Sequence, residues 1–150
     1  METKALRDFT REISPDYTVS FHTKGEEIYW RFYQSQEAVR RDRAVAEKIA
    51  QTTGYPLADA KGSAGGYKDW CIQTFKIPSF TIEVGKDEFL HPLGMDALAD
   101  ILEKNTEKGF LKSVLTVVFP ALTVTEPAAK AVAFTVANEA QASILILPKA

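Results

Sequence analysis

The strongest constraint on the fold is a short β-rich run that ends in a histidine. Residues 17–21 alternate between apolar and polar side chains, which predicts a strand. His22 follows directly, and Gly25 then lets the chain turn sharply. A histidine at the end of a central strand can point its imidazole into a site at the edge of the sheet. The alternative is a partly buried histidine that is hydrogen-bonded to the backbone.

A second β-rich run, at residues 78–85, carries a carboxylate, Glu83, inside an apolar strand pattern. A buried glutamate is costly unless a partner compensates its charge, and a metal site would supply that partner. His22 and Glu83 are therefore two candidate site residues, each at the end of a predicted strand.

The remaining periodicity predicts an α/β fold, a mixed β-sheet with helices on both faces. Apolar residues recur at helical spacing in residues 3–13, 36–52, 67–75 and 94–104, and a strand is predicted at 79–84. Ser35 is the predicted N-cap and Gly54 the predicted C-cap of the second helix. We interpret the charged run at residues 40–43 as a solvent-exposed helix face.

Composition limits the classes of protein to which the chain can belong. Its 150 residues, 45% hydrophobic and 25% charged, suit one ordinary globular core. A net charge of −2 and apolar runs shorter than a membrane span lead us to expect no nucleic acid and no membrane as partner. Cys71 is the single cysteine and is predicted to be a small buried residue. The charged start, without an apolar signal region, favours a cytoplasmic location.

From residue 109 onward the composition becomes apolar, with few charges. Residues 114–118 and 144–147 are strand-like, whereas Pro120 and Pro127 interrupt the pattern. We divide the chain into residues 1–108 and an apolar tail, residues 109–150. The tail is either an extra edge hairpin or a non-native segment.

Residues 17–30, 62–70 and 78–85 together resemble three ordered motifs of the zinc carboxypeptidase (M14-type) family of metallopeptidases. The chain is most similar to the bacterial γ-D-glutamyl-diamino-acid peptidases, which cut cell-wall peptides. The resemblance implies that residues 1–108 form the C-terminal half of such a domain. It also implies that His22 is a zinc ligand and that Glu83 is the general base toward the zinc-bound water. Because both would then act at one zinc-bound water, we predict that they end neighbouring or near-neighbouring strands and that their side chains converge on the same side of the sheet edge.

The resemblance further implies a substrate-binding region. Lys68, which precedes the Asp69-Trp70 pair, would line the specificity pocket and attract an anionic side chain, and the alternative is a surface lysine. The resemblance extends the substrate-binding role to Gly66, Tyr67 and Thr81. Asp69 is predicted to cap or orient the backbone, and Trp70 to pack.

The chain departs from the family pattern at several points. The zinc-binding His-x-x-Glu motif is missing, and the other histidine, His91, is interpreted as a loop residue. Lys61 stands where the family has a mobile tyrosine, although Tyr55 and Tyr67 lie nearby in the sequence. One zinc ligand is therefore present and the others are absent from the chain, so we expect an N-terminal half supplied by a longer chain.

Three hypotheses about function follow. The first is a zinc-dependent, carboxypeptidase-type hydrolase, or a fragment of one, that acts on a γ-D-glutamyl-diamino-acid bond in a cell-wall peptide. The second is an inactive module that binds a peptide or a peptidoglycan stem. The third is a truncation without a physiological role.

Overall fold

The computed structural model describes residues 2–59, 64–88, 90, 95–105, 132–136 and 142–147. The described helices are α1 (Glu2–Ile13), α2 (Gln36–Thr53), α3 (Tyr67–Phe75) and α4 (Met95–Asn105). The described strands are β1 (Tyr17–His22), β2 (Glu27–Tyr29), β3 (Leu57–Ala58), β4 (Ser79–Glu83), β5 (Val132–Val136) and β6 (Ala142–Leu147). These bounds agree with the predicted helices and strands to within one residue at most ends.

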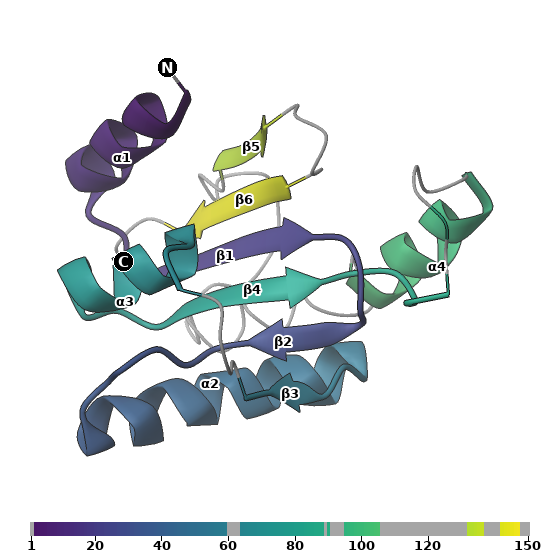
Figure 1. Ribbon diagram of the computed structural model, residues 1–150, viewed down its shortest axis with the longest axis horizontal. Coiled ribbons are helices and arrows are strands. Elements are labelled where there is room, and N and C mark those ends of the chain that lie inside the picture. Colours follow the sequence, from purple (N-terminus) through teal and green to yellow (C-terminus); the bar gives the residue numbers. More distant parts are fainter. Residues whose placement is uncertain are drawn as a thin grey trace, which may run out of the picture.

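The strands form one mixed sheet in the order β3-β2-β4-β1-β6-β5 (Figure 1). The central pair, β1 and β4, is parallel, whereas β2 runs antiparallel to β4 on one side and β6 runs antiparallel to β1 on the other. Within the predicted tail, β6 therefore pairs with β1, and β5 pairs with β6. The strand-like run at residues 114–118 lies outside the described residues, and the boundary at residue 108 stays a prediction.

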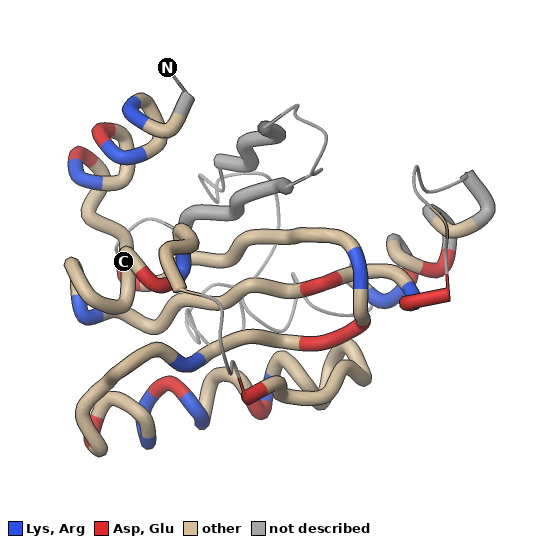
Figure 2. Tube along the Cα trace, in the orientation of Figure 1, with Lys and Arg blue, Asp and Glu red and all other residues tan. Residues whose placement is uncertain are grey.

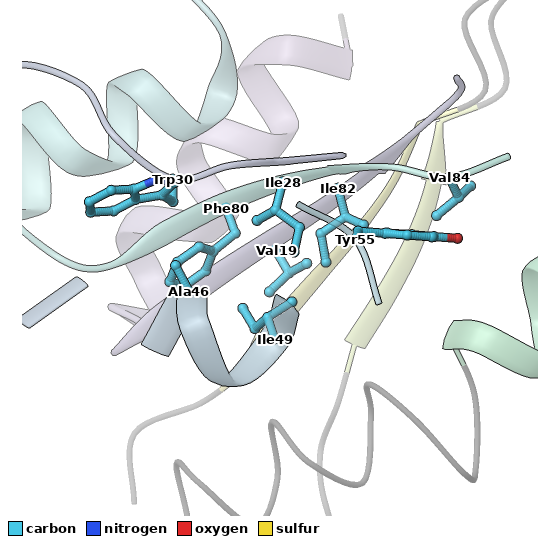
Figure 3. Packing of buried hydrophobic residues seen from close by; sticks show 9 residues of the cluster. All are labelled: Val19, Ile28, Trp30, Ala46, Ile49, Tyr55, Phe80, Ile82 and Val84. Carbon is cyan, nitrogen blue, oxygen red and sulfur yellow. The ribbon is translucent and has the colours of Figure 1, made fainter. Parts of the chain in front are cut away.

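One face of the sheet is apolar and packs against α2. Val19, Ile28, Phe80 and Ile82 are each at most 1% exposed and belong to one buried cluster. The same cluster includes Ile49 of α2, as Figure 3 shows. Because strand residues alternate between faces, these residues all point to one side.

The opposite face of the same strands is polar, and α3 lies over one end of it. Thr18 of β1 donates a hydrogen bond to Ser79 of β4 at 2.8 Å, and both hydroxyls are buried. Cys71 of α3 is fully buried, and the Thr18 and Ser79 side chains act on the pKa of its thiol, which places α3 over these two strands. Helices therefore cover both faces of the sheet, which confirms the predicted α/β architecture.

The caps of α2 form as predicted from sequence. The Ser35 hydroxyl accepts a hydrogen bond from the backbone N–H of Ala38 at 3.2 Å, and Gly54 ends the helix in the left-handed conformation with φ of 76°. The prediction that residues 40–43 form an exposed face is wrong for Asp42, which is fully buried. Asp42 accepts hydrogen bonds from Gln34 at 2.7 Å and from Arg41 at 2.6 Å, and these partners compensate its burial.

Candidate active site

Three side chains that can bind ligands lie in one row across adjacent strands. His22 at the end of β1 is the direct partner of Glu83 at the end of β4, and Glu83 is also the partner of Glu27 at the start of β2. Directly opposed strand residues project their side chains to the same face of a sheet. Figure 2 shows acidic positions at the adjoining ends of β2 and β4. We call these three residues the His22–Glu83–Glu27 row.

The predicted placement of His22 and Glu83 at the ends of neighbouring strands, on one face of the sheet, is confirmed by the strand register. They end neighbouring strands, and the backbone N–H of Val84 donates to the His22 carbonyl oxygen at 2.8 Å, which continues the pairing past the strand end. Their metal-binding and catalytic roles stay predictions.

A second row of polar residues lies on the same face, two residues along each strand from the first row. Ser20, Thr81 and Tyr29 are register partners on the same face. The Ser20 and Thr81 hydroxyls are hydrogen-bonded at 3.0 Å, and the Tyr29 hydroxyl donates to the Glu27 carboxylate. The predicted substrate-binding residue Thr81 therefore lies on the same face as Glu83, one row away.

The surroundings of the row disfavour the charged forms of Glu83 and His22. Burial, and secondly the nearby Glu27 carboxylate, raise the pKa of Glu83 to about 7. Burial lowers the pKa of His22 from its ordinary value. The hydrogen bond to Glu27 is the largest cause that raises the pKa of Tyr29 to about 12. Among the described residues, no lysine or arginine forms an ion pair with Glu27 or Glu83.

The described donors do not fit a complete metal centre. Within the described ranges, no group of three or more His, Cys, Asp and Glu side chains is arranged to hold a metal ion. A catalytic zinc site needs three protein ligands and one open position. His22 is the histidine that the structure places at the row, and His91 lies outside the described residues.

Lys68, the predicted specificity residue, lies buried at the start of α3. Its ammonium forms an ion pair with Asp69, and the two side chains are 8% and 6% exposed. It also donates to the Arg31 carbonyl oxygen at 3.2 Å and lies 5.5 Å from the centre of the Phe32 ring. Lys68 is thus paired within the chain, and its role toward a substrate stays a prediction.

Asp69 orients the backbone, as predicted. One carboxylate oxygen accepts hydrogen bonds from the N–H groups of Gly65 and Gly66 at 3.1 and 3.3 Å, so the acidic side chain caps the start of α3. Trp70 packs between aromatic neighbours, with its ring 6.0 Å from that of Tyr67 and 5.1 Å from that of Phe75. Cys71 is fully buried, as predicted.

The predicted substrate-binding residues Gly66 and Tyr67 line a pocket between α1 and α3. The pocket has a volume of about 350 Å³, and its lining includes Lys4, Arg7 and Trp70. Lys68 is not among the residues that line it. The structure therefore separates Gly66 and Tyr67, which face this pocket, from Lys68, which points toward the segment after β2.

The candidates for the mobile tyrosine occupy well-defined positions. The Tyr55 hydroxyl accepts a hydrogen bond from Asn105 at 3.1 Å, and Tyr55 is 2% exposed. The Tyr67 hydroxyl is hydrogen-bonded with Thr10 at 2.9 Å. Lys61 lies outside the described residues.

Two curated proteins are similar to parts of this chain. A stretch of 84 residues, 56% of the chain, is 34% identical to the "Gamma-D-glutamyl-L-diamino acid endopeptidase 1" of Lysinibacillus sphaericus and covers 21% of that protein. A stretch of 112 residues, 73% of the chain, is 30% identical to the "Uncharacterized protein YqgT" of Bacillus subtilis (strain 168) and covers 28% of it. The chain thus spans less than a third of the length of either relative. No family model matches the chain.

The first of these relatives carries the name of the enzyme class that the sequence motifs resemble. The finer assignment to the M14-type zinc carboxypeptidases stays a prediction. No helix in the described part of the chain has the length and apolar character that crossing a bilayer requires.

Two residues of the polar face, Glu27 and Tyr29, were not predicted as site residues from the sequence. They flank Ile28, which is fully buried on the opposite face. Polar and apolar residues alternate at Glu27, Ile28 and Tyr29, which indicates a half-buried strand. This pattern could have predicted that both polar side chains lie on one face of the sheet.

Proposed function

We propose that this chain carries part of the active site of a peptidase that cleaves the γ-D-glutamyl–diamino-acid bond of cell-wall peptides. The observation that carries the proposal is the His22–Glu83–Glu27 row. The similarity to a protein named as a γ-D-glutamyl-L-diamino acid endopeptidase supports the choice of substrate.

Glu83 is the general base in this proposal. A base that works near neutral pH needs a pKa close to the pH of the reaction, and the pKa of Glu83 is raised to about 7. Its carboxylate would accept a proton from the attacking water and return it to the leaving amine. Burial, and secondly the opposed carboxylate of Glu27, raise the pKa of Glu83.

His22 would contribute one ligand to a zinc ion in the same proposal. Because the described residues offer no three-donor group, the remaining ligands would come from outside these residues. The zinc dependence and the carboxypeptidase type are the finer parts of the proposal and rest on the sequence motifs around His22 and Glu83.

A chimaeric enzyme tests this assignment. The 84-residue segment of the Lysinibacillus sphaericus endopeptidase that matches this chain is replaced by the corresponding residues of the chain, and release of the diamino acid from a γ-D-glutamyl peptide is measured. We expect hydrolysis by the chimaera and at least about a hundredfold loss of kcat in Glu83→Gln, because general-base catalysis contributes about 10²–10⁴-fold. Lys48→Gln, a change at an exposed position of α2, is the control and leaves kcat unchanged.

The proposal is wrong if a folded, active chimaera keeps its kcat when Glu83 is changed to Gln. Folding of each variant is checked by circular dichroism and thermal unfolding before the assay.

A second candidate function is a module that binds the same peptides without cleaving them. The observation that favours it is the lack of a three-donor group among the described residues. Calorimetric titration of the full chain with a γ-D-glutamyl-diaminopimelate peptide measures binding, and the chimaera shows whether cleavage accompanies it. Saturable binding by the chain, together with a folded chimaera that leaves the peptide intact in excess zinc, favours the module.

A further inference from the structure

The last turn of α4 is joined by an ion pair to the turn that connects β1 and β2. Lys104 Nζ lies 2.7 Å from Glu26 Oε1, and the two side chains are 29% and 25% exposed. Lys104 also lies 3.1 Å from Asp100 Oδ2, one helical turn earlier on α4. The first pair joins residues 78 positions apart in the sequence, whereas the second stays within the helix.

A second contact fixes the same end of α4 to the core. Asn105 donates a hydrogen bond to the Tyr55 hydroxyl at 3.1 Å, and both residues are buried. The Lys104 ammonium lies 5.8 Å from the centre of the Tyr55 ring, within the range of a cation–π contact. Two neighbouring residues of α4, Lys104 and Asn105, thus contact two separate segments, the turn after β1 and Tyr55.

The turn that Lys104 holds lies directly against the candidate active site. Its two ends are His22 and Glu27, and the N–H of Gly25 donates to the Gly85 carbonyl oxygen at 2.8 Å. A Cβ atom added to Gly25 would lie 3.5 Å from the Cβ of Glu83. A change in the path of this turn would therefore move His22 and Glu27 relative to Glu83.

The backbone of the turn needs external support. Glu26 is a non-glycine residue with φ of 51°, in the left-handed region that L-amino acids rarely occupy. Such conformations persist when the surrounding structure holds them in place. Its side chain carries the one ion pair that the described residues form with this turn.

We propose that Lys104 is a positioning residue: through its ion pair with Glu26 it holds residues 23–26 so that His22 and Glu27 stay beside Glu83. The inference rests on the proposed function in that it assigns Lys104 to the same site. It predicts order in the turn even without metal or substrate, so it can be tested separately from the function.

Amide hydrogen exchange of the full chain tests the proposal by NMR. In Lys104→Met, which keeps the length and helix propensity of the side chain, we expect the amides of Gly25 and Val84 to exchange about two to five times faster. Amides in the middle of β1 and β4, such as those of Val19 and Phe80, keep their rates. Lys104→Arg restores the slow exchange because it keeps the charge.

Asp100→Asn is the matched control, because it removes the ion pair within α4 and leaves the pair with Glu26. We expect wild-type exchange of the Gly25 amide in this variant. Glu26→Gln should reproduce the effect of Lys104→Met, and the double variant should exchange no faster than either single variant.

The ring protons of His22 provide a second measurement. They report the position of the turn, which a general loss of stability would not change. We expect the ring proton shifts of His22, measured at one fixed pH, to move in Lys104→Met and to keep their wild-type values in Lys104→Arg. Unchanged Gly25 exchange and His22 shifts in Lys104→Met overturn the proposal, as does an equal acceleration of all amides. An inactive chimaera with the expected exchange pattern would contradict only the proposed function.

Discussion

The two oxygens of the Asp69 carboxylate have different partners at the start of α3. One accepts from the N–H groups of Gly65 and Gly66, and the other forms the ion pair with Lys68. Both charged side chains are more than 90% buried. Removing one partner of a buried pair leaves an uncompensated charge, whereas removing both does not.

The first prediction concerns this pair. Asp69→Ala should lower the free energy of unfolding by about 3–4 kcal/mol, because it leaves the Lys68 ammonium buried without its carboxylate and removes the cap of α3. The double variant Asp69→Asn/Lys68→Met should recover at least about half of this loss. Urea unfolding of the wild-type protein, Asp69→Ala, Asp69→Asn and the double variant measures these values. If Lys68→Met in the Asp69→Asn background brings no recovery, the charge of Lys68 is not what makes Asp69 necessary.

The second prediction concerns Cys71. Burial raises the pKa of its thiol to about 11. The folded state therefore keeps the thiol neutral while the unfolded chain ionises near its ordinary value, so this group's contribution to stability is full below pH 9 and is lost as the pH rises through 11. At pH 8 we expect a thiol reagent to label the native protein at least about a hundredfold more slowly than the urea-unfolded chain. Equal rates would mean that the thiol is accessible in the native protein.

At the scale of secondary-structure elements, α2 begins at the N-cap Ser35 and ends at the C-cap Gly54, and both caps bond only to residues of the same helix. Gly54 has φ of 76°, and its N–H donates to the Ala50 carbonyl oxygen at 2.9 Å. A Cβ added there would meet no atom within 4 Å, so a substitution is limited by the backbone conformation and not by crowding.

The third prediction concerns the backbone conformation of Gly54. Gly54→Ala should lower the free energy of unfolding by about 1 kcal/mol. The left-handed backbone conformation is strained for an L-residue, and the added methyl group makes no contact that would compensate the strain. Gly54→Asn is the matched control, since asparagine tolerates this region, and should lose less than about half as much. Thermal unfolding of the two variants side by side provides the comparison. Equal losses would show that the left-handed backbone is not the cause.

At the scale of the whole molecule, the candidate active site exists because β4 lies between β1 and β2. The parallel pairing of β1 with β4 brings together residues 61 positions apart, and the antiparallel pairing of β2 adds Glu27. The row nevertheless offers one imidazole and two carboxylates, and the described residues contain no group of donors arranged for a metal.

The fourth prediction is weak zinc binding by the isolated chain. We expect a Kd above about 1 μM at neutral pH and no measurable hydrolysis of a γ-D-glutamyl peptide, because a catalytic zinc site needs three well-oriented protein ligands. Calorimetric titration with zinc measures the affinity. Sub-micromolar binding at one site per chain, abolished by His22→Ala, would show that this chain completes the site by itself.

Local sequence was sufficient for the four helices and for β1 and β4, whereas β2, β3 and β5 were not predicted as strands. Alternation predicted β1 and β4, helical periodicity predicted the helices, and Ser35 and Gly54 marked the ends of α2 because capping depends on a few neighbouring residues. The sequence also placed His22 and Glu83 at strand ends, and the motif resemblance suggested that they meet.

Only the tertiary structure decided which polar residues share an environment. Asp42 lies in a run of arginines that looks exposed, yet Gln34 and Arg41 surround it in a buried position. Lys68 is paired inside the protein, and Lys104 reaches a turn 78 residues away. Burial and long-range pairing depend on how elements pack, and the pattern of one segment carries no information about the segment that packs against it.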